Sequence, residues 1–516
     1  MRQRMLCFVL VLVFSAVLAA RAFGQIPGYP APRYPKVPHI TTVEQLMPYA
    51  RYVVSKQGDK TIIMRPGYDI HGGEKVLIRT GDTTDPLVIE AFRRAFIEKG
   101  ATVDVLVFHS NPAVAKRPVA GINELAGAYW IFPNAAQMKA GMIAADEQSK
   151  ILDQFIRAKK YDLVVGNGGA GWVGIEQPYN IERMNWFTRE MLASPATTYP
   201  EEILNLVDRK GWEMIRQAKT ARFTDPEGTD ISWTWFPTYW QVVEGTHPEV
   251  HSIGGGPGDG KSGYYYGRGA SEDPLIPGHL MGVPEGIVLP ESDGEGVIVG
   301  TANHAGPYPR MEMHFKNHEV TQLIGGGEYG DKLRELFDHF KDLQYPLYPR
   351  KGFAFLVECA IGTNPKIVRQ FDVMEDIPQN SLWVDERRRS GVVHWGIGII
   401  ARENELYAQE NDAPTYHYHL HQYFPTYEIT LPNGKKELLV NKGRVTSLDD
   451  PEIRRVAAKY GDPDELLRED WIPAIPGINA PGDYLKDYAQ DPAKWITEEH
   501  RKAFADDIAF MKAGYK

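Results

Sequence analysis

The chain is organised around residues 353–365, which read FAFLVECAIGTNP. This apolar run has strand character, carries a single carboxylate at Glu358, and stops at a turn favoured by Gly362, Asn364 and Pro365. A carboxylate within an apolar strand needs a partner, because burying an unpaired charge is costly. We expect that partner among the histidines that follow.

Two histidine-bearing segments follow, GVVHWGI at 391–397 and YHYHLH at 416–421. Side chains two residues apart in a strand share a face, so His419 and His421 can converge, with His417 next along that row. Together with Glu358 and His394 they suggest a metal site, because imidazole and carboxylate are common ligands of catalytic metals. The alternative is that His394 is an ordinary core residue and that the later pair decorates a surface strand.

These segments resemble the thermophilic aminopeptidase family, that is, aminopeptidase T and its relatives, which also includes 2,5-dihydroxypyridine dioxygenases. EKVLI at 74–78, with DPL at 85–87, is similar to the family's opening strand and helix. ARFTDPEGTD at 221–230 looks like its T-D-P-x-G-T-D entry to the catalytic domain, and VPEGIV at 283–288 stands where the family usually has P-x-G-E-V. The resemblance covers most of residues 70–445 and implies that Glu358, His394, His419 and His421 are metal ligands.

Two departures from the family pattern each remove a carboxylate. The family's first metal-binding glutamate falls on Ile287, and its H-x-D becomes His419-Leu420-His421. A two-metal centre depends on carboxylates that bridge or balance two dications, so we expect one metal per chain, either zinc, cobalt or manganese. Glu285 and Glu291 lie near enough in sequence to replace the missing carboxylate or act as a general base, and the sequence does not choose between them.

The sequence predicts an α/β N-terminal domain followed by a β-rich α+β metal-binding domain and a helical C-terminal extension. Strands are expected at 76–79, 102–108 and 163–165, and helices at 86–99, 148–159 and 201–219. Further strands are expected at 296–300, 311–315, 353–357 and 427–431, and C-terminal helices at 451–460 and 497–511. The boundaries are a signal peptide at 1–24, a Pro-rich leader at 25–40, the α/β domain at 41–220, the β-rich catalytic domain at 221–445 with an insertion at 245–282, and the extension at 446–516.

The N-terminus has the features of a secretory signal peptide. Two early arginines precede an apolar core and a small-residue cleavage site, and the core is too short for a membrane span. The mature protein would be periplasmic or secreted, with no membrane association after cleavage. Cys7 would leave with this peptide, so Cys359 would remain alone, on the strand face opposite Glu358.

Composition excludes some partners. The net charge of −10 and the absence of a basic stretch argue against nucleic-acid binding. The sequence leaves open whether the chain forms a homodimer, and the C-terminal extension would cover either the core or a partner subunit.

Two glycine-rich segments match the consensus motifs of nucleotide-binding loops, but the sequence around each segment does not fit such a loop. GNGGAG at 166–171 comes late in its domain and is followed by a poor helix start, so we interpret it as a tight turn. GGPGDGKS at 255–262 satisfies the P-loop expression, yet the Gly- and Pro-containing sequence after it does not form the required helix. No cofactor-binding residues are therefore predicted.

Three functions remain open from the sequence. The first is a metal-dependent hydrolase resembling aminopeptidases, which acts on a peptide or small-molecule amide with Glu285 or Glu291 as the base. The second is a mononuclear Fe(II) ring-cleaving dioxygenase resembling the dihydroxypyridine enzymes. The third is a binding protein on a scaffold that has lost its chemistry, for which the only support is the loss at Ile287.

Overall fold

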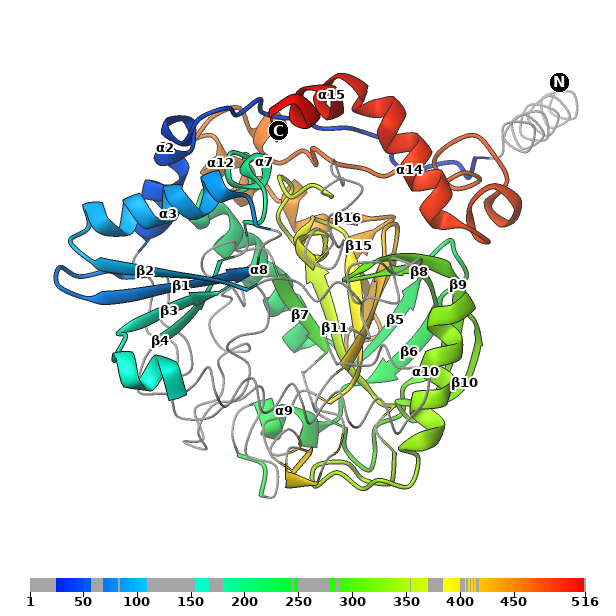
Figure 1. The fold of residues 1–516 in the computed structure, drawn as a ribbon. Coiled ribbons are helices and arrows are strands. Elements are labelled where there is room, and N and C mark those ends of the chain that lie inside the picture. The colour runs from blue at the N-terminus through cyan, green and yellow to red at the C-terminus, as the bar shows by residue number, and fades with distance from the viewer. Residues whose placement is uncertain are drawn as a thin grey trace, which may run out of the picture.

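The structure, a computed structural model, describes residues 25–56, 68–81, 84–108, 154–166, 180–184, 186–243, 246–248, 279–283, 288–352, 354–369, 384–399, 404, 407–408, 410–411, 413 and 417–514. Within these ranges the chain has a mixed α/β structure with three sheets (Figure 1). The expected signal peptide and both nucleotide-type strings, apart from Gly166, lie outside them.

The N-terminal sheet is parallel, with the strand order β2-β1-β3-β4. Its strands and its neighbouring helices are α2 (Val43–Val54), β1 (Lys75–Gly81), α3 (Pro86–Glu98), β2 (Thr102–Phe108), β3 (Leu163–Gly166), β4 (Asn180–Arg183) and α7 (Arg189–Leu192). The next helix, α8 (Glu201–Gln217), buries its apolar residues in the core of the antiparallel sheets instead. Asp85 begins α3, because its side chain accepts a hydrogen bond from the backbone N–H of Leu87 at 2.9 Å. The predicted strands and the helices at 86–99 and 201–219 are confirmed, and residues 154–159 of the third predicted helix are helical.

The largest sheet is antiparallel, with the order β10-β9-β8-β6-β5-β14-β15-β16. Its strands are β5 (Thr220–Thr224), β6 (Asp230–Thr234), β8 (Glu295–Asn303), β9 (Gly306–Lys316), β10 (Glu319–Gly325), β14 (Thr426–Thr430), β15 (Lys436–Asn441) and β16 (Arg444–Val445). The nearby helices are α9 (Pro237–Val243) and α10 (Gly327–His339), and Figure 1 shows α10 beside β9 and β10.

The third sheet, which we call the site sheet, is antiparallel with the order β13-β12-β11-β7. Its strands are β7 (His279–Val283), β11 (Leu356–Gly362), β12 (Val393–Gly398) and β13 (His417–Gln422), and the 3-10 helix η3 (Val384–Arg388) precedes β12. The expected strand at 353–357 was placed too early. The chain before Leu356 bridges from Phe355 to Glu319 instead, and β11 continues past Glu358, which lies within a strand as expected.

Aromatic side chains join the site sheet to the largest sheet. Trp395 of β12 lies edge-on to Phe223 and Trp233, with ring centroids 4.7 and 5.9 Å apart. Gln422 of β13 adds a hydrogen bond to the carbonyl of Val299 on β8 at 2.9 Å. Alternate residues of β12 and β13 therefore fill the core between the sheets, and the residues between them face the other way.

The C-terminal extension packs on the rest of the chain. It contains η4 (Thr446–Asp449), α12 (Pro451–Ala457), α13 (Pro463–Leu466), η5 (Tyr484–Tyr488), α14 (Pro492–Ala503) and α15 (Ala505–Gly514). Ile472, Ile475 and Ile496 join the core that lies against the parallel sheet, so this extension covers the core of its own chain. The leader runs beside it, since the backbones of Arg33 and Ile472 pair (Figure 1).

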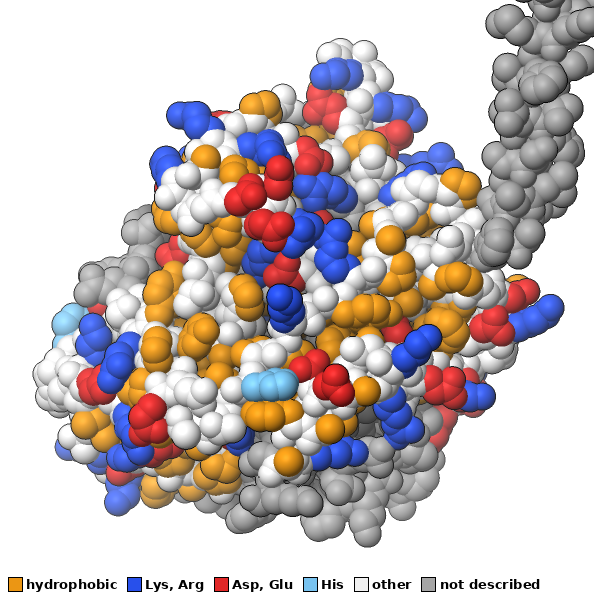
Figure 2. Space-filling model, turned by 90° about the horizontal axis from the view of Figure 1, so that it is seen from above, with side chains coloured by type: hydrophobic (Ala, Val, Ile, Leu, Met, Phe, Trp, Pro, Cys, Tyr) orange, Lys and Arg blue, Asp and Glu red, His pale blue; other side chains and the backbone are white. Residues whose placement is uncertain are grey.

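Seen from above, this face of the molecule carries Lys, Arg, Asp and Glu side chains interspersed with hydrophobic ones (Figure 2). The described helices include none that is both long and apolar enough to cross a membrane.

Candidate metal centre

Strand register brings the predicted ligands onto one face of the site sheet. His394 lies directly opposite His421, and Gly396 lies between His419 on one side and Glu358 on the other. Because Gly396 has no side chain, nothing on the middle strand separates His419 from Glu358. Cys359 points the other way into the core, as predicted, and burial raises the pKa of its thiol well above the usual range.

Glu358 is the acceptor at the centre of this face. His394 Nε2 lies 2.8 Å from one carboxylate oxygen, and His419 Nε2 lies 3.7 Å from the other. All three side chains are buried. The structure thus brings together Glu358, His394, His419 and, through strand pairing, His421.

A fifth group, His304, was not foreseen from the sequence. It occupies the tight turn between β8 and β9, where the Asn303 side chain accepts hydrogen bonds from the backbone N–H groups of Ala305 and Gly306. Its ring stacks on His419 with centroids 3.6 Å apart, and its Nδ1 lies 2.7 Å from His421 Nε2. The local signal was an Asn-x-x-Gly turn after an apolar strand, which predicts a hairpin but not what its tip contacts. We call Glu358, His304, His394, His419 and His421 the histidine cluster.

Arg387 on η3 fixes the hydrogen positions in part of this cluster. Its Nη1 lies 3.2 Å from His304 Nε2, and a guanidinium group can only donate. His304 Nε2 therefore accepts, so the proton of the neutral ring is on Nδ1 and is donated to His421 Nε2. Arg387, His304 and His421 form a chain of donors that runs in one direction.

Burial keeps these imidazoles neutral. The pKa of His304 is held well below its usual range, first by burial and then by His419, His421 and Arg387 nearby. Burial, followed by the neighbouring His394, likewise lowers the pKa of His421. Neutral imidazole is the form that binds a metal, so the cluster has ligand character at physiological pH.

The donor atoms of the histidine cluster are of kinds that bind catalytic metals. Four imidazoles and one carboxylate are the ligand types of zinc and of non-haem iron. Buried His421 Nδ1, which carries the proton of the neutral ring when Nε2 accepts from His304, has no hydrogen-bond partner among the described residues. The side chains nevertheless contact one another, and the described residues contain no group of three or more His, Cys, Asp or Glu already arranged to hold a metal. A bound ion would take up lone pairs that these groups now direct at each other.

The remaining predicted residues are less informative. Glu285 and Ile287 lie outside the described residues, as does the side chain of His417. Glu291 is described, and it accepts a hydrogen bond from Thr238 on α9 rather than from any member of the histidine cluster. Its role as a general base stays a prediction.

Known proteins resemble this chain only remotely. No family model matches it, and no curated protein sequence does. A 2,5-dihydroxypyridine dioxygenase from Pseudomonas putida KT2440 is a similar solved structure, with 15% identity and a TM-score of 0.44 over 80% of this chain and 99% of that one. Wild-type AmpT from Thermus thermophilus is another, with 12% identity and a TM-score of 0.39 over 78% of this chain and 99% of that one.

Proposed function

We propose that this protein is an exported enzyme that uses one metal ion, and that it is a hydrolase resembling aminopeptidases. The observation that carries the proposal is the convergence of His394 and His419 on Glu358, at 2.8 and 3.7 Å, on a buried face that also holds two neutral imidazoles. Two His and one carboxylate form the protein ligand set of several catalytic zinc sites. When bound, a divalent ion would lower the pKa of a water molecule attached to it and would polarise the carbonyl group of the substrate.

The residues of the chain would divide the remaining tasks. Glu358, His394 and His419 would hold the ion, with His421 completing the set. The stacked ring of His304 keeps His419 in place and shields it from solvent. Glu285 and Glu291 remain the candidates for the base that accepts a proton from the attacking water.

The same donor set supports a second function, a ring-cleaving Fe(II) dioxygenase, because two His and one carboxylate are also the facial ligands of non-haem iron oxygenases. We place hydrolysis first because an exported protein would have to acquire and keep Fe(II) under oxidising conditions. A redox-inert ion does not have that requirement.

Metal analysis and two assays separate these functions. The purified protein should contain close to one metal per chain and, after chelation, regain activity with zinc, cobalt or manganese. It should release amines from aminoacyl anilides without oxygen consumption. Oxygen uptake with a dihydroxylated pyridine or benzene, dependent on added Fe(II) and lost in Glu358→Ala, would reverse the ranking. Absence of both activities would favour the binding-protein hypothesis.

A further inference from the structure

Two carboxyl groups are buried together in the turn between β5 and β6. Asp225 and Glu227 are 7% and 4% exposed, and the Asp225 side chain accepts a hydrogen bond from the backbone N–H of Glu227 at 2.9 Å. The Glu227 carboxyl accepts two further hydrogen bonds, from the hydroxyls of Tyr484 on η5 at 2.9 Å and of Thr301 on β8 at 3.1 Å. These donors are uncharged, and they come from segments that lie far apart in the chain.

Neither carboxyl has an ion-pair partner among the described residues. Arg310 faces the turn from β9, but its guanidinium donates to the backbone carbonyl of Glu227, at 3.2 and 3.3 Å, and to the carboxylate of Glu312. One oxygen of each carboxyl, Asp225 Oδ2 and Glu227 Oε1, is buried without a hydrogen-bond partner in the described part of the chain. An unpaired charge is costly to bury, so both groups occupy this position as neutral, protonated acids. Burial accordingly raises the pKa of both, and the charge of Asp225 raises that of Glu227 further.

Tyrosines from other segments surround these carboxyls. They are Tyr484 and Tyr488 on η5, Tyr423 after β13 and Tyr29 in the leader. Burial, with a smaller contribution from the charge of Asp225 or Glu227, raises the pKa of each tyrosine above its usual ~10, so the tyrosines stay neutral. Arg310 lowers the pKa of Glu227, but by less than burial raises it. Cations lie behind two of the rings, Arg369 over Tyr423 at 4.8 Å and Lys442 over Tyr29 at 5.1 Å. Among these described groups, the two carboxyls are therefore the ones that change charge near neutral pH.

The same turn is the place where η5 and the start of the leader attach to the largest sheet. The backbone carbonyl of Ala489, just after η5, accepts a hydrogen bond from the backbone N–H of Arg310 at 2.8 Å. In the leader, the ring of Tyr29 lies edge-on to Phe424, with centroids 5.8 Å apart. Leu485 in the middle of η5 is 58% exposed, so one side of this segment already faces solvent. A segment at the surface can detach while the core of the sheet stays folded.

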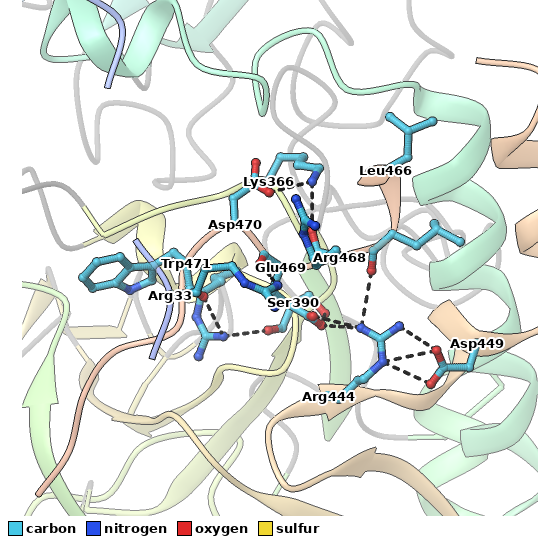
Figure 3. Close-up of polar contacts among 12 residues, drawn as sticks. Arg33, Lys366, Ser390, Arg444, Asp449, Leu466, Arg468, Glu469, Asp470 and Trp471 are labelled. Atoms are coloured by element: carbon cyan, nitrogen blue, oxygen red, sulfur yellow. Dashed lines mark hydrogen bonds and ion pairs between the residues drawn. The ribbon is translucent and has the colours of Figure 1, made fainter. Parts of the chain in front are cut away.

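An earlier part of the C-terminal extension is held by ion pairs instead (Figure 3). Arg444 Nη1 lies 2.9 Å from both carboxylate oxygens of Glu469, and Lys366 Nζ donates to Asp470 at 2.8 Å. Charge-assisted hydrogen bonds of this kind require ionised carboxylates, whereas the contacts at η5 require neutral ones. The two parts of the extension therefore differ in the protonation state that holds them.

The part held by ion pairs also fixes the segment before β12. Trp471 Nε1 donates to Glu386 on η3 at 3.2 Å, and the Ser390 hydroxyl donates to Glu469 at 3.2 Å. Detachment of η5 would leave these contacts, and with them the position of Arg387, unchanged.

We propose that η5 and the start of the leader are held by the protonated forms of Asp225 and Glu227, and that this part of the extension opens locally as the pH rises. The inference does not depend on the proposed metal-dependent function. In the open state both carboxyls meet water and ionise at their ordinary pKa values of ~3.9 and ~4.3. Between those values and about 8, the docked state keeps protons that the open state releases. The opening equilibrium should therefore shift toward the open state by up to about tenfold per pH unit for each proton kept, and then level off.

The test is hydrogen–deuterium exchange of the full chain, read by mass spectrometry at pH 5.5 to 8.5 and corrected for the intrinsic exchange rate at each pH. The backbone amides of Asp487, Ala489 and Asp491 are hydrogen-bonded within 482–491, so they report the opening of this segment. Their opening constant should rise at least tenfold from pH 5.5 to pH 8 in the wild type, whereas that of residues 465–470 should not. The double variant Asp225→Asn, Glu227→Gln keeps both side chains neutral and should abolish the rise.

The control is Asp462→Asn, which changes an exposed aspartate of the same extension that also accepts a hydrogen bond from the backbone two residues later, at 2.9 Å. It should keep the wild-type pH dependence at 482–491. An undiminished rise in the double variant would overturn the inference. A wild-type opening constant at 482–491 that does not rise, or that rises no more than at 465–470, would overturn it as well. If the double variant does not fold, this comparison of two segments in the wild type decides alone.

Discussion

Two buried polar groups flank the end of β8, and burial affects them in opposite ways. His304, just after the strand, belongs to the histidine cluster, whereas Thr301 donates a hydrogen bond to Glu227, 3.1 Å away. Glu227 and Asp225 form what we call the acid pair, and both are almost fully buried. Burial raises the pKa of Asp225 to about 7 and, together with the charge of Asp225, that of Glu227 to about 8.

The difference between the two regions shows that burial disfavours whichever protonation state of a side chain carries the charge. In the histidine cluster the penalised form is protonated, so burial favours the neutral form of His304 and His421, which is the form of an imidazole that can bind a metal. In the acid pair the penalised form is deprotonated, so protons are retained near neutral pH. We therefore expect the first region to respond to metal and the second to respond to pH.

The largest expected effect is loss of metal from the histidine cluster. His394→Ala and His419→Ala should each lower metal affinity by more than the ~10–100-fold that changes outside the ligand set typically cost, because each removes a ligand. His417→Ala should have a smaller effect. Metal content after dialysis against a competing chelator measures this.

The matched control is His314→Ala, which removes a half-exposed histidine on β9 that contacts Glu312. It should retain metal fully. Full metal occupancy in both His394→Ala and His419→Ala would show that the cluster is a structural hydrogen-bond network. The histidine cluster and the acid pair would then differ only in which protonation state burial favours.

A change at a close backbone contact beside the histidine cluster should affect metal binding almost as much as the loss of a ligand. A methyl group on Gly362 would lie 2.1 Å from the carbonyl oxygen of Arg389 and 2.5 Å from that of Arg387. Gly362→Ala must therefore push η3 away from β11, at a cost of about 1–3 kcal/mol in unfolding free energy, and should weaken binding at the histidine cluster. Chemical denaturation and metal titration measure the two effects.

Gly72→Ala provides the comparison, because a methyl group there meets no atom within 4 Å. It should leave metal affinity unchanged. Unchanged metal affinity in Gly362→Ala as well would mean that the position of Arg387 has no influence on the cluster.

The acid pair should make stability fall with rising pH. The pKa of Glu227 is about 8 in the folded chain and ~4.3 when unfolded. Between these values the folded state holds a proton that the unfolded state has released, so stability declines from pH ~4.3 to about 8 and then levels off. Glu227→Gln stays neutral throughout and should be more stable than the wild type by up to about 5 kcal/mol at pH 8.5, because a difference of ~3.7 pKa units corresponds to that free energy, with a much smaller difference near pH 5.

Thermal unfolding of the two proteins across this pH range measures the gap. Glu202→Gln is the control, because Glu202 is an exposed glutamate that also accepts a tyrosine hydrogen bond. Its stability should follow the wild-type pH dependence. A gap between wild type and Glu227→Gln that does not widen with pH would show that Glu227 is ionised in the folded protein.

The sequence predicted the members of the histidine cluster that lie on strands, because their positions follow from local periodicity. The two-residue period of strands put His419 and His421 on one face, and the apolar setting of Glu358 and His394 marked them as buried. It did not reveal His304 or Arg387, which lie on a hairpin tip and a 3-10 helix. Their contacts depend on how β8 and the C-terminal extension pack against the site sheet, and such packing between distant segments has no local pattern.

The same reasoning explains why the acid pair was overlooked. Glu227 stood in the T-D-P-x-G-T-D segment as a variable position. Its burial comes from η5, more than two hundred residues later, whose Tyr484 donates a hydrogen bond to it at 2.9 Å. The fold class could be predicted from alternating strand and helix periods, whereas the extension was predicted only as a helical cover.

The smallest expected effect concerns that Tyr484 contact. Tyr484→Phe removes one of the two donors to Glu227 and leaves the one from Thr301, so it should destabilise the protein by about 1 kcal/mol at pH 6, where Glu227 is protonated. The Tyr484 hydrogen bond lowers the pKa of Glu227, which means that it favours the ionised form. The loss should therefore grow above pH 8. Tyr460→Phe removes a similar hydrogen bond to Glu202 on the surface and should change stability at neither pH, because water replaces the lost donor. Denaturation of both variants at pH 6 and pH 9 measures this, and an equal loss from Tyr484→Phe at the two pH values would mean that Glu227 does not change charge between them.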